Sequence, residues 1–144
     1  MARMPQTFLS LSLFSLSEAA TVAGVSLVAT MGYVRRGLLP LAVEAGPELR
    51  TRKLDAVGVI CLCVVRELRR RGLSRAAIKP ITDFLGSHTL WELHSQMLKR
   101  NTILVAGDKS PPELISSAAM MLLATVKNHN LIAVDLKSVS PFKS

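Results

Sequence analysis

Arginine and lysine side chains gather at three places in the sequence, and side chains of this kind bind anions. A guanidinium group offers several N–H donors that fit phosphate oxygens through charge-assisted hydrogen bonds. The three groups are Arg35 with Arg36, then Arg50, Arg52 and Lys53, and last Arg66, Arg69, Arg70 and Arg71. We expect the first two groups to contact phosphate. For the third group, contact with DNA and simple solvation of a charged helix end are equally good interpretations.

The overall charge supports an anionic partner. The chain of 144 residues carries 18 Lys and Arg against 10 Asp and Glu, a formal net charge of +8. Residues 1–86 hold 12 basic and 6 acidic residues, whereas residues 87–144 hold 6 and 4, so most of the excess lies in the first part. This balance points to nucleic acid first and to an acidic membrane surface second.

Residues that could catalyse a reaction or hold a metal form no recognisable constellation. Cys61 and Cys63 lie inside an apolar stretch, where thiols are more often buried small hydrophobes than metal ligands or redox sensors. His88, His94 and His129 lack the paired spacing of zinc ligands. No ordered nucleophile, base and oxyanion donor can be recognised. We therefore expect no enzymatic activity, no cofactor and no metal.

The N-terminal segment could pass for a short signal peptide, because an arginine precedes the apolar run Phe8–Leu16. Alternating serines in this run instead favour a short strand that enters a helix cap. Glu18 and the pair Arg35–Arg36 interrupt the longest apolar candidate, so no window of about 20 residues could span a membrane. We expect a soluble, cytoplasmic protein with no membrane partner.

The residues that must position the basic groups follow the pattern of two short helices joined by a tight turn. Ser17 is expected to cap a helix over Glu18–Ala23, and Gly24 ends this helix by taking a left-handed conformation. Ser26 then caps a second helix, from Leu27 to about Arg36. Such a pair forms the helix-turn-helix unit, whose second helix can fill a major groove.

Further elements follow this pair. A turn over Glu44–Glu48 leads into the basic limb Leu49–Lys53, and together they predict a hairpin. A longer amphipathic helix is expected from Asp55 to about Arg71. Another helix begins after Ser74, and we expect it to be kinked or to restart at Pro80, which lacks an amide hydrogen.

The C-terminal part predicts a small β-α-β unit. A capping box at Thr89–Glu92 opens a short helix, and Thr102–Ala106 has the composition of a buried strand. Ser110–Glu113 is a second capping box with prolines at the first helical positions, so we expect a helix that continues to Val126. Leu131–Leu136 would pair in parallel with the first strand. So small a unit should pack on the preceding helices or on a second subunit.

The N-terminal pattern resembles the MerR-type winged-helix DNA-binding domain over roughly Thr7 to Leu85. The segments that carry the resemblance are Phe14–Ala20, Ala23–Ser26, Tyr33, Arg35, Gly37–Pro40, Arg52–Asp55, Leu62, Val65, Leu68, Gly72–Ser74 and Ile78. The resemblance implies a recognition helix that begins at Ser26 and a basic wing on the phosphate backbone. Leu27 to Thr30 offer few of the Asn, Gln, Arg or Lys side chains that usually read bases.

The expected fold is mainly α with short β, a winged helix-turn-helix over residues 7–86 followed by a β-α-β appendage over residues 87–144. The residues expected to contact DNA are Ser26, Leu27, Thr30, Tyr33, Arg35, Arg36, Arg50, Arg52 and Lys53. The expected function is that of a homodimeric transcriptional regulator that binds double-stranded DNA, with an appendage that mediates either oligomerisation or the binding of a protein partner. The alternative is a protein-interaction module, antitoxin-like or an adaptor, in which the helix-turn-helix is vestigial.

Overall fold

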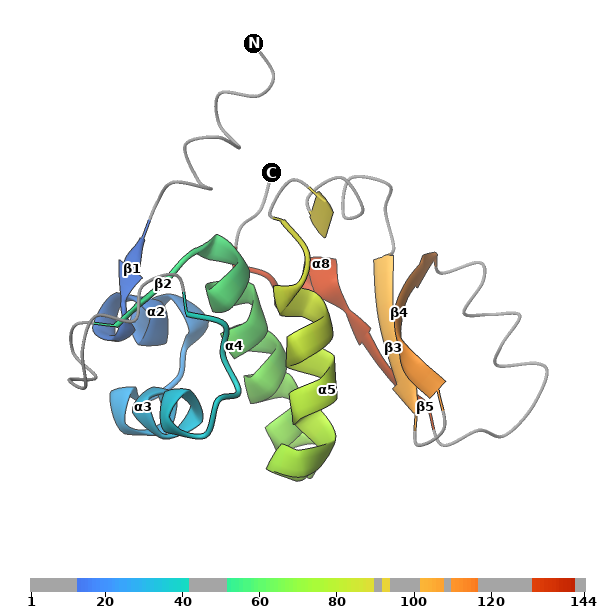
Figure 1. Cartoon of the computed structure of the whole chain (residues 1–144), viewed down its shortest axis with the longest axis horizontal. Coiled ribbons are helices and arrows are strands. Elements are labelled where there is room, and N and C mark those ends of the chain that lie inside the picture. The colour runs from blue at the N-terminus through green and yellow to red at the C-terminus, as the bar shows by residue number, and fades with distance from the viewer. Residues whose placement is uncertain are drawn as a thin grey trace, which may run out of the picture.

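Two helices, α4 (Ala56–Arg70) and α5 (Arg75–Gly86), occupy the centre of the computed structural model (Figure 1). The structure describes residues 13–41, 52–89, 92–93, 102–107, 110–116 and 131–141. A small unit of two helices and two short strands lies on one side of α4 and α5, and a three-stranded sheet lies on the other side. The prediction of mainly helical structure with short strands is confirmed.

Helix α4 is buried on nearly every side. Its N-cap is Asp55, whose Oδ1 accepts a hydrogen bond from the amide of Gly58 at 2.9 Å. Every residue from Ala56 to Val65 is buried, and so is Leu68. The sequence predicted this helix correctly but with only one buried face. A helix that is apolar all round belongs in the interior, and here α5, two other helices and a strand pack against it.

Helix α2 (Leu16–Ala23) begins earlier than predicted. Ser15 is its N-cap instead of Ser17: the Ser15 hydroxyl accepts from the Glu18 amide at 3.1 Å, and Glu18 Oε1 accepts from the Ser15 amide at 2.9 Å. This capping box satisfies two amide groups that the helix start would leave free. The hydrogen bond from the Ser15 amide is the main cause of the lowered pKa of Glu18.

A short strand does precede this cap, as the alternating serines predicted. Strand β1 (Phe14–Ser15) pairs antiparallel with β2 (Lys53–Leu54), so that Phe14 lies opposite Leu54. Strand β2 belongs to the predicted basic limb, while residues 42–51, which contain the rest of the predicted hairpin, lie outside the described residues. The two strands bring the start of α2 next to the start of α4.

Helix α5 does not restart at Pro80, because the helix is continuous from Arg75 to Gly86. Its N-cap is Ser74, whose Oγ accepts from the Ala77 amide at 3.2 Å, as predicted. Pro80 is exposed, so its ring lies on the solvent side of the helix. The backbone carbonyl that loses its helical partner can therefore bond to water.

The prediction of a parallel β-α-β unit is wrong. Strands β3 (Thr102–Gly107), β4 (Ser110–Ser116) and β5 (Leu131–Asp135) form a sheet in the order β4-β3-β5, and both outer strands run antiparallel to β3. Ser110–Glu113, predicted to open a helix, belongs to β4. Pro111 and Pro112 can be accommodated because β4 is an edge strand and the two prolines lie between the pairs Gly107–Ser110 and Val105–Glu113, where the register shifts. Residues 117–130 lie outside the described residues.

The sheet packs on the central helices, which is the first of the two arrangements expected for this part. Helix α8 (Leu136–Val139) follows β5 and contacts α4, and β4 contacts α5. Leu104, Val134 and Leu136 join the same hydrophobic core as the residues of α2 and α4. The guanidinium of Arg71, at the end of α4, donates to the carbonyl of Ala133 at 2.7 Å. Residues before and after residue 86, the expected boundary, therefore share one hydrophobic core.

The capping box predicted at Thr89 is confirmed. The Thr89 hydroxyl accepts from the Glu92 amide at 3.1 Å, and Glu92 Oε1 accepts from the Thr89 amide at 2.7 Å. The rest of the predicted short helix, residues 94–100, lies outside the described residues. Across the described parts of the chain, every helix is too short or too polar to cross a membrane.

Pro40 is held between α4 and α5 by two glycines. A Cβ atom at Gly58 would lie 3.0 Å from the Pro40 carbonyl oxygen, and one at Gly86 would lie 3.0 Å from the Pro40 ring. The preceding Leu38 and Leu39 are buried in the core. The absence of both side chains thus lets the segment after residue 37 sit tightly against the two central helices.

Candidate nucleic-acid interface

Two short helices, α2 and α3 (Leu27–Arg35), are joined by the turn Gly24–Ser26, as the sequence predicted. Gly24 has a φ of +71°, a left-handed conformation that glycine adopts without strain, and the next amide donates to the carbonyl of Ala20 at 2.9 Å. The Ser26 hydroxyl accepts from the Ala29 amide at 3.1 Å and so caps α3. The helix therefore has a well-defined start next to α2.

The exposed side of α3 is apolar at its start and basic at its end. Val28 is 81% exposed and Leu27 is 43% exposed. Arg35 and Arg36 are both exposed at the other end. Arg36 lies back along the helix, where its Nη1 donates to the Gly32 carbonyl at 3.2 Å. The exposed Arg35 side chain makes no hydrogen bond or ion pair with the described residues.

The other predicted contact residues of α3 face inward or serve its structure. Thr30 is fully buried, and its hydroxyl donates to the Ser26 carbonyl at 2.9 Å, so it cannot reach a ligand in this structure. Tyr33 is half-buried and packs against the core, which agrees with its more frequent role as a packing aromatic. The Ser26 hydroxyl is exposed; it accepts the hydrogen bond of the cap and keeps its own hydrogen to donate. Of these three side chains, only Ser26 is therefore placed to contact a ligand.

The predicted wing is only partly described, because Arg50 lies outside the described residues. Lys53 is half-buried in β2 and contributes to the lowered pKa of Glu18, although less than the Ser15 hydrogen bonds do. Arg52 is also half-buried, and its Nε is buried with no hydrogen-bond partner among the described residues. Arg52 and Lys53 are thus the described candidates for a phosphate contact from this limb.

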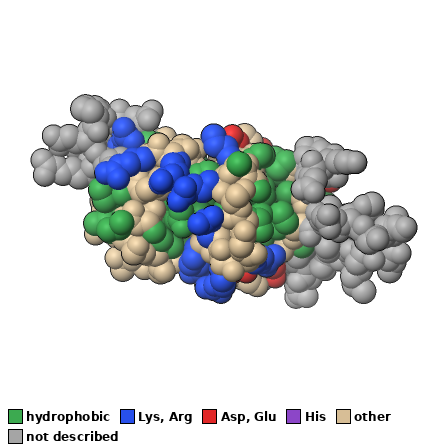
Figure 2. Space-filling model, turned by 90° about the horizontal axis from the view of Figure 1, so that it is seen from below, with side chains coloured by type: hydrophobic (Ala, Val, Ile, Leu, Met, Phe, Trp, Pro, Cys, Tyr) green, Lys and Arg blue, Asp and Glu red, His purple; other side chains and the backbone are tan. Residues whose placement is uncertain are grey.

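The third basic group consists of Arg66, Arg69, Arg70 and Arg71, and each of these side chains contacts another group of the same chain. Those contacts are Arg66 Nη1 to Ala23 O (2.6 Å), Arg69 Nη1 to Leu73 O (2.9 Å), Arg70 Nη1 to Glu67 Oε1 (3.6 Å) and Arg71 Nε to Glu67 Oε2 (2.9 Å). Arg66 reaches the last carbonyls of α2, where a cation suits the helix dipole. Figure 2 shows that Lys and Arg side chains gather across the face seen from below, although several of them have internal partners.

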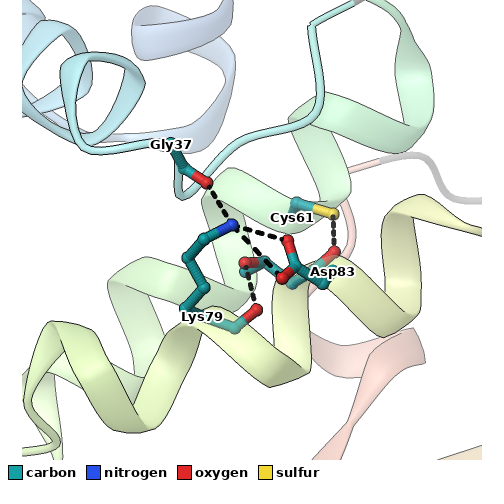
Figure 3. Close-up of polar contacts among 5 residues, drawn as sticks. Gly37, Cys61, Lys79 and Asp83 are labelled. Carbon is teal, nitrogen blue, oxygen red and sulfur yellow. Dashed lines mark hydrogen bonds and ion pairs between the residues drawn. The ribbon is translucent and has the colours of Figure 1, made fainter.

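A lysine that the sequence did not single out fixes the end of α3 to α5. Lys79 Nζ donates to the Gly37 carbonyl at 3.1 Å and to Asp83 Oδ1 at 2.9 Å (Figure 3). The spacing of Lys79 and Asp83 is visible in the sequence, whereas the contact with Gly37 depends on the fold. An exposed ion pair of this kind adds little stability, so its main effect is to position the segment after α3.

The two cysteines are buried small side chains, as predicted. Cys61 is 0% exposed and Cys63 is 1% exposed. The Cys61 thiol lies 4.0 Å from the carbonyl of Thr82 (Figure 3). Burial raises the pKa of both thiols above the ordinary value. Within the described ranges, no three His, Cys, Asp or Glu residues are placed to hold a metal ion.

Both thiols are expected to resist alkylation in the folded protein. The thiolate is the reactive form, and burial disfavours it as well as blocking the reagent. Incubation with iodoacetamide near neutral pH, followed by mass spectrometry, should give unmodified protein, while the same treatment in guanidinium chloride should modify both cysteines. Native modification at the rate of free glutathione would contradict the buried placement of Cys61 and Cys63.

Comparisons of the chain with protein-family models, with curated proteins and with solved structures gave no match. The chemistry available to the site therefore has to be argued from α3 and its surroundings. Exposed aliphatic side chains at the start of α3 and exposed guanidinium groups at its end can contact a surface that is both apolar and anionic.

Proposed function

We propose that the chain is a cytoplasmic, homodimeric transcriptional regulator that binds double-stranded DNA. In this proposal α3 enters the major groove, Arg35, Arg36 and Lys53 contact phosphates, and α2 lies against the backbone. The observation that carries the proposal is the exposed helix α3, which follows the capped turn Gly24–Ser26 and ends in two exposed arginines. The second helix of such a pair is the usual reading element of helix-turn-helix proteins.

The charge distribution supports the same proposal. Phosphate contacts provide most of the nonspecific affinity of DNA-binding proteins, because each one releases condensed counterions. Arg35 has no competing partner among the described residues, and Arg36 has one long bond to a backbone carbonyl. Both side chains can therefore turn toward phosphate without breaking an ion pair.

The double variant Arg35→Ala/Arg36→Ala is expected to bind duplex DNA more weakly at every sequence. Each lost phosphate contact should reduce the slope of log affinity against log salt by about 0.9, so the slope should fall by nearly 2 for the pair. Fluorescence anisotropy of a labelled duplex, measured over about 50–200 mM salt, gives both the affinity and the slope. Far-UV circular dichroism checks that the variant is folded.

The matched control is Arg35→Lys/Arg36→Lys, which keeps both charges and should keep most of the salt dependence. If the alanine pair binds like the parent chain, the end of α3 is not part of the interface. If the parent chain shows no salt-dependent binding to any duplex, the proposed function itself fails.

Selection from a random duplex pool tests whether the binding is specific. Enrichment of a palindrome would support both sequence recognition and a two-fold dimer, because half-site symmetry mirrors protein symmetry. Retention of the pool without enrichment would indicate binding through the backbone alone.

The alternative function, a protein-interaction module, is favoured by one observation. Val28 and Leu27 expose aliphatic surface on α3 where a DNA reader usually carries hydrogen-bonding side chains. Apolar contacts are not weakened by salt in the way that phosphate contacts are. A complex of the full chain with another protein that survives high salt, without salt-dependent DNA binding, would favour this second function.

A further inference from the structure

The start of α3 exposes two large aliphatic side chains to solvent. Val28 is the most exposed large hydrophobic side chain among the described residues, at 81%, and Leu27 beside it is 43% exposed. Both lie in the first turn of the helix, directly after the cap Ser26. The N-terminal residues of a recognition helix are the ones that meet base edges in the major groove.

The side chains of this turn offer few hydrogen-bonding groups with which to recognise bases. Leu27 and Val28 carry no donor or acceptor in their side chains, and Met31, one turn further along, has only a weakly accepting sulfur. The Ser26 hydroxyl accepts a hydrogen bond from the Ala29 amide and keeps its own hydrogen to donate, while the Thr30 hydroxyl is buried and bonded to the Ser26 carbonyl. Beyond the Ser26 cap, the exposed side chains of the first turn of α3, Leu27 and Val28, can therefore make only apolar contacts.

Basic residues at the other end of the same helix indicate what covers this turn. Arg35 and Arg36 are exposed at the far end of the same helix, and Lys53 lies in β2 at the start of α4. An apolar strip that ends in guanidinium groups is complementary to an apolar strip bordered by phosphates. In duplex DNA the thymine C5 methyl group provides such an apolar element on the floor of the major groove.

We infer that Leu27 and Val28 read thymine by contacting its C5 methyl group, so that the chain prefers A·T-containing sites. This inference rests on the proposed DNA binding and adds the chemical feature of the base that α3 recognises. It also explains why the start of the helix is aliphatic, because aliphatic side chains would contribute nothing to contacts with DNA phosphates alone.

The test uses two alternating duplexes, of dA-dT and of dA-dU, which differ only in the thymine methyl group. The full chain is bound to labelled dA-dT duplex at fixed salt, and each unlabelled duplex is used as competitor. The dU duplex is expected to compete about fourfold more weakly for each methyl group in contact, the factor that follows from burying one methyl-sized group. A second pair, dG-dC with and without cytosine C5 methylation, should show tighter binding of the methylated duplex.

The double variant Leu27→Ser/Val28→Ser is expected to bring the ratio of dT to dU binding close to one while leaving the salt slope unchanged, because backbone contacts are retained. The matched control is Leu13→Ser. Leu13 is also exposed, at 46%, but it precedes β1, which lies on the far side of α2 from α3 in Figure 1. The control variant should keep the preference of the parent chain. All three substitutions are at exposed positions, and circular dichroism monitors the folding of both variants.

The outcomes separate the two proposals. Absence of salt-dependent binding to every duplex overturns the proposed function together with this inference. Salt-dependent binding with equal affinity for dT and dU overturns the methyl contact and leaves DNA binding intact. A preference that survives Leu27→Ser/Val28→Ser overturns the assignment to α3. Conversion of a dimer to a monomer by Leu27→Ser/Val28→Ser, with no dT preference in the parent chain, shows instead that a second copy of the chain covers this surface.

Discussion

Replacing Leu62 by alanine is expected to lower the free energy of unfolding by about 2–5 kcal/mol. Leu62 is 0% exposed and lies in the middle of α4, the helix against which α2, α5, α8 and β2 all pack. A cavity there cannot collapse easily, because elements on several sides are held by their own contacts. The total stability of such a chain is about 5–15 kcal/mol, so the loss is a large fraction of it.

Urea unfolding followed by far-UV circular dichroism measures this change. Leu27→Ala is the matched control, since it removes the same atoms from a helix position that is 43% exposed. It should change stability by no more than about 0.5 kcal/mol. If the two variants lose equal stability, α4 is not the centre of the core.

Gly58→Ala is expected to lower stability by about 1–3 kcal/mol, as overpacking does, although alanine is the better helix former by nearly 1 kcal/mol. The added Cβ would lie 3.0 Å from the Pro40 carbonyl oxygen and 3.1 Å from both Cβ and Cδ2 of Leu54. The carbonyl is backbone and Leu54 is fully buried, so neither neighbour can move away freely.

Gly32→Ala in α3 is the control for this substitution. A Cβ at Gly32 would meet the Nη1 atom of Arg36 at 3.2 Å, the flexible end of an exposed side chain that can move aside. The helical propensity of alanine should then dominate and raise stability by up to about 1 kcal/mol. Thermal unfolding should show opposite shifts for the two variants. A rise in melting temperature for Gly58→Ala would contradict the close approach of Pro40 to α4.

The helices of the N-terminal part could be predicted because their boundaries depend on local chemistry. Gly24 ends α2, while Ser26, Asp55 and Ser74 cap the helices that follow them, and each cap bonds an amide only three residues away. The displaced cap of α2 is an error of the same local kind, since Ser15 and Ser17 are equally good caps and only Ser15 has Glu18 at the position that completes a capping box.

The sheet could not be predicted because the segment after Gly107 has the composition of a helix start, and because β5 pairs with β3 from far along the chain. Ser110–Glu113 has the composition of a helix start, yet it pairs with β3, and β5 pairs with the other side of β3. Local propensity is weak compared with the contacts that β3 offers on both edges. The all-round burial of α4 likewise depends on α8, which no local pattern in α4 can reveal.

The candidate site was predictable only where the placement of a residue depends on local sequence. The exposure of Arg35 and Arg36 follows from their place at the end of a capped helix. The inward direction of Thr30, the bond from Arg66 to Ala23 and the bond from Lys79 to Gly37 depend on tertiary packing. The number of Lys and Arg residues in the sequence is therefore larger than the number whose side chains can bind a ligand.

The position of Pro40 between two helices also limits how this sequence can change over time. Gly58 and Gly86 come from separate helices, yet each must stay small because Pro40 lies against it. A larger residue at position 86 would first require a smaller one at position 40, whereas Gly58 faces the Pro40 carbonyl oxygen, which every residue at position 40 carries. Position 86 can therefore change together with position 40, while position 58 can change only if the backbone at position 40 shifts.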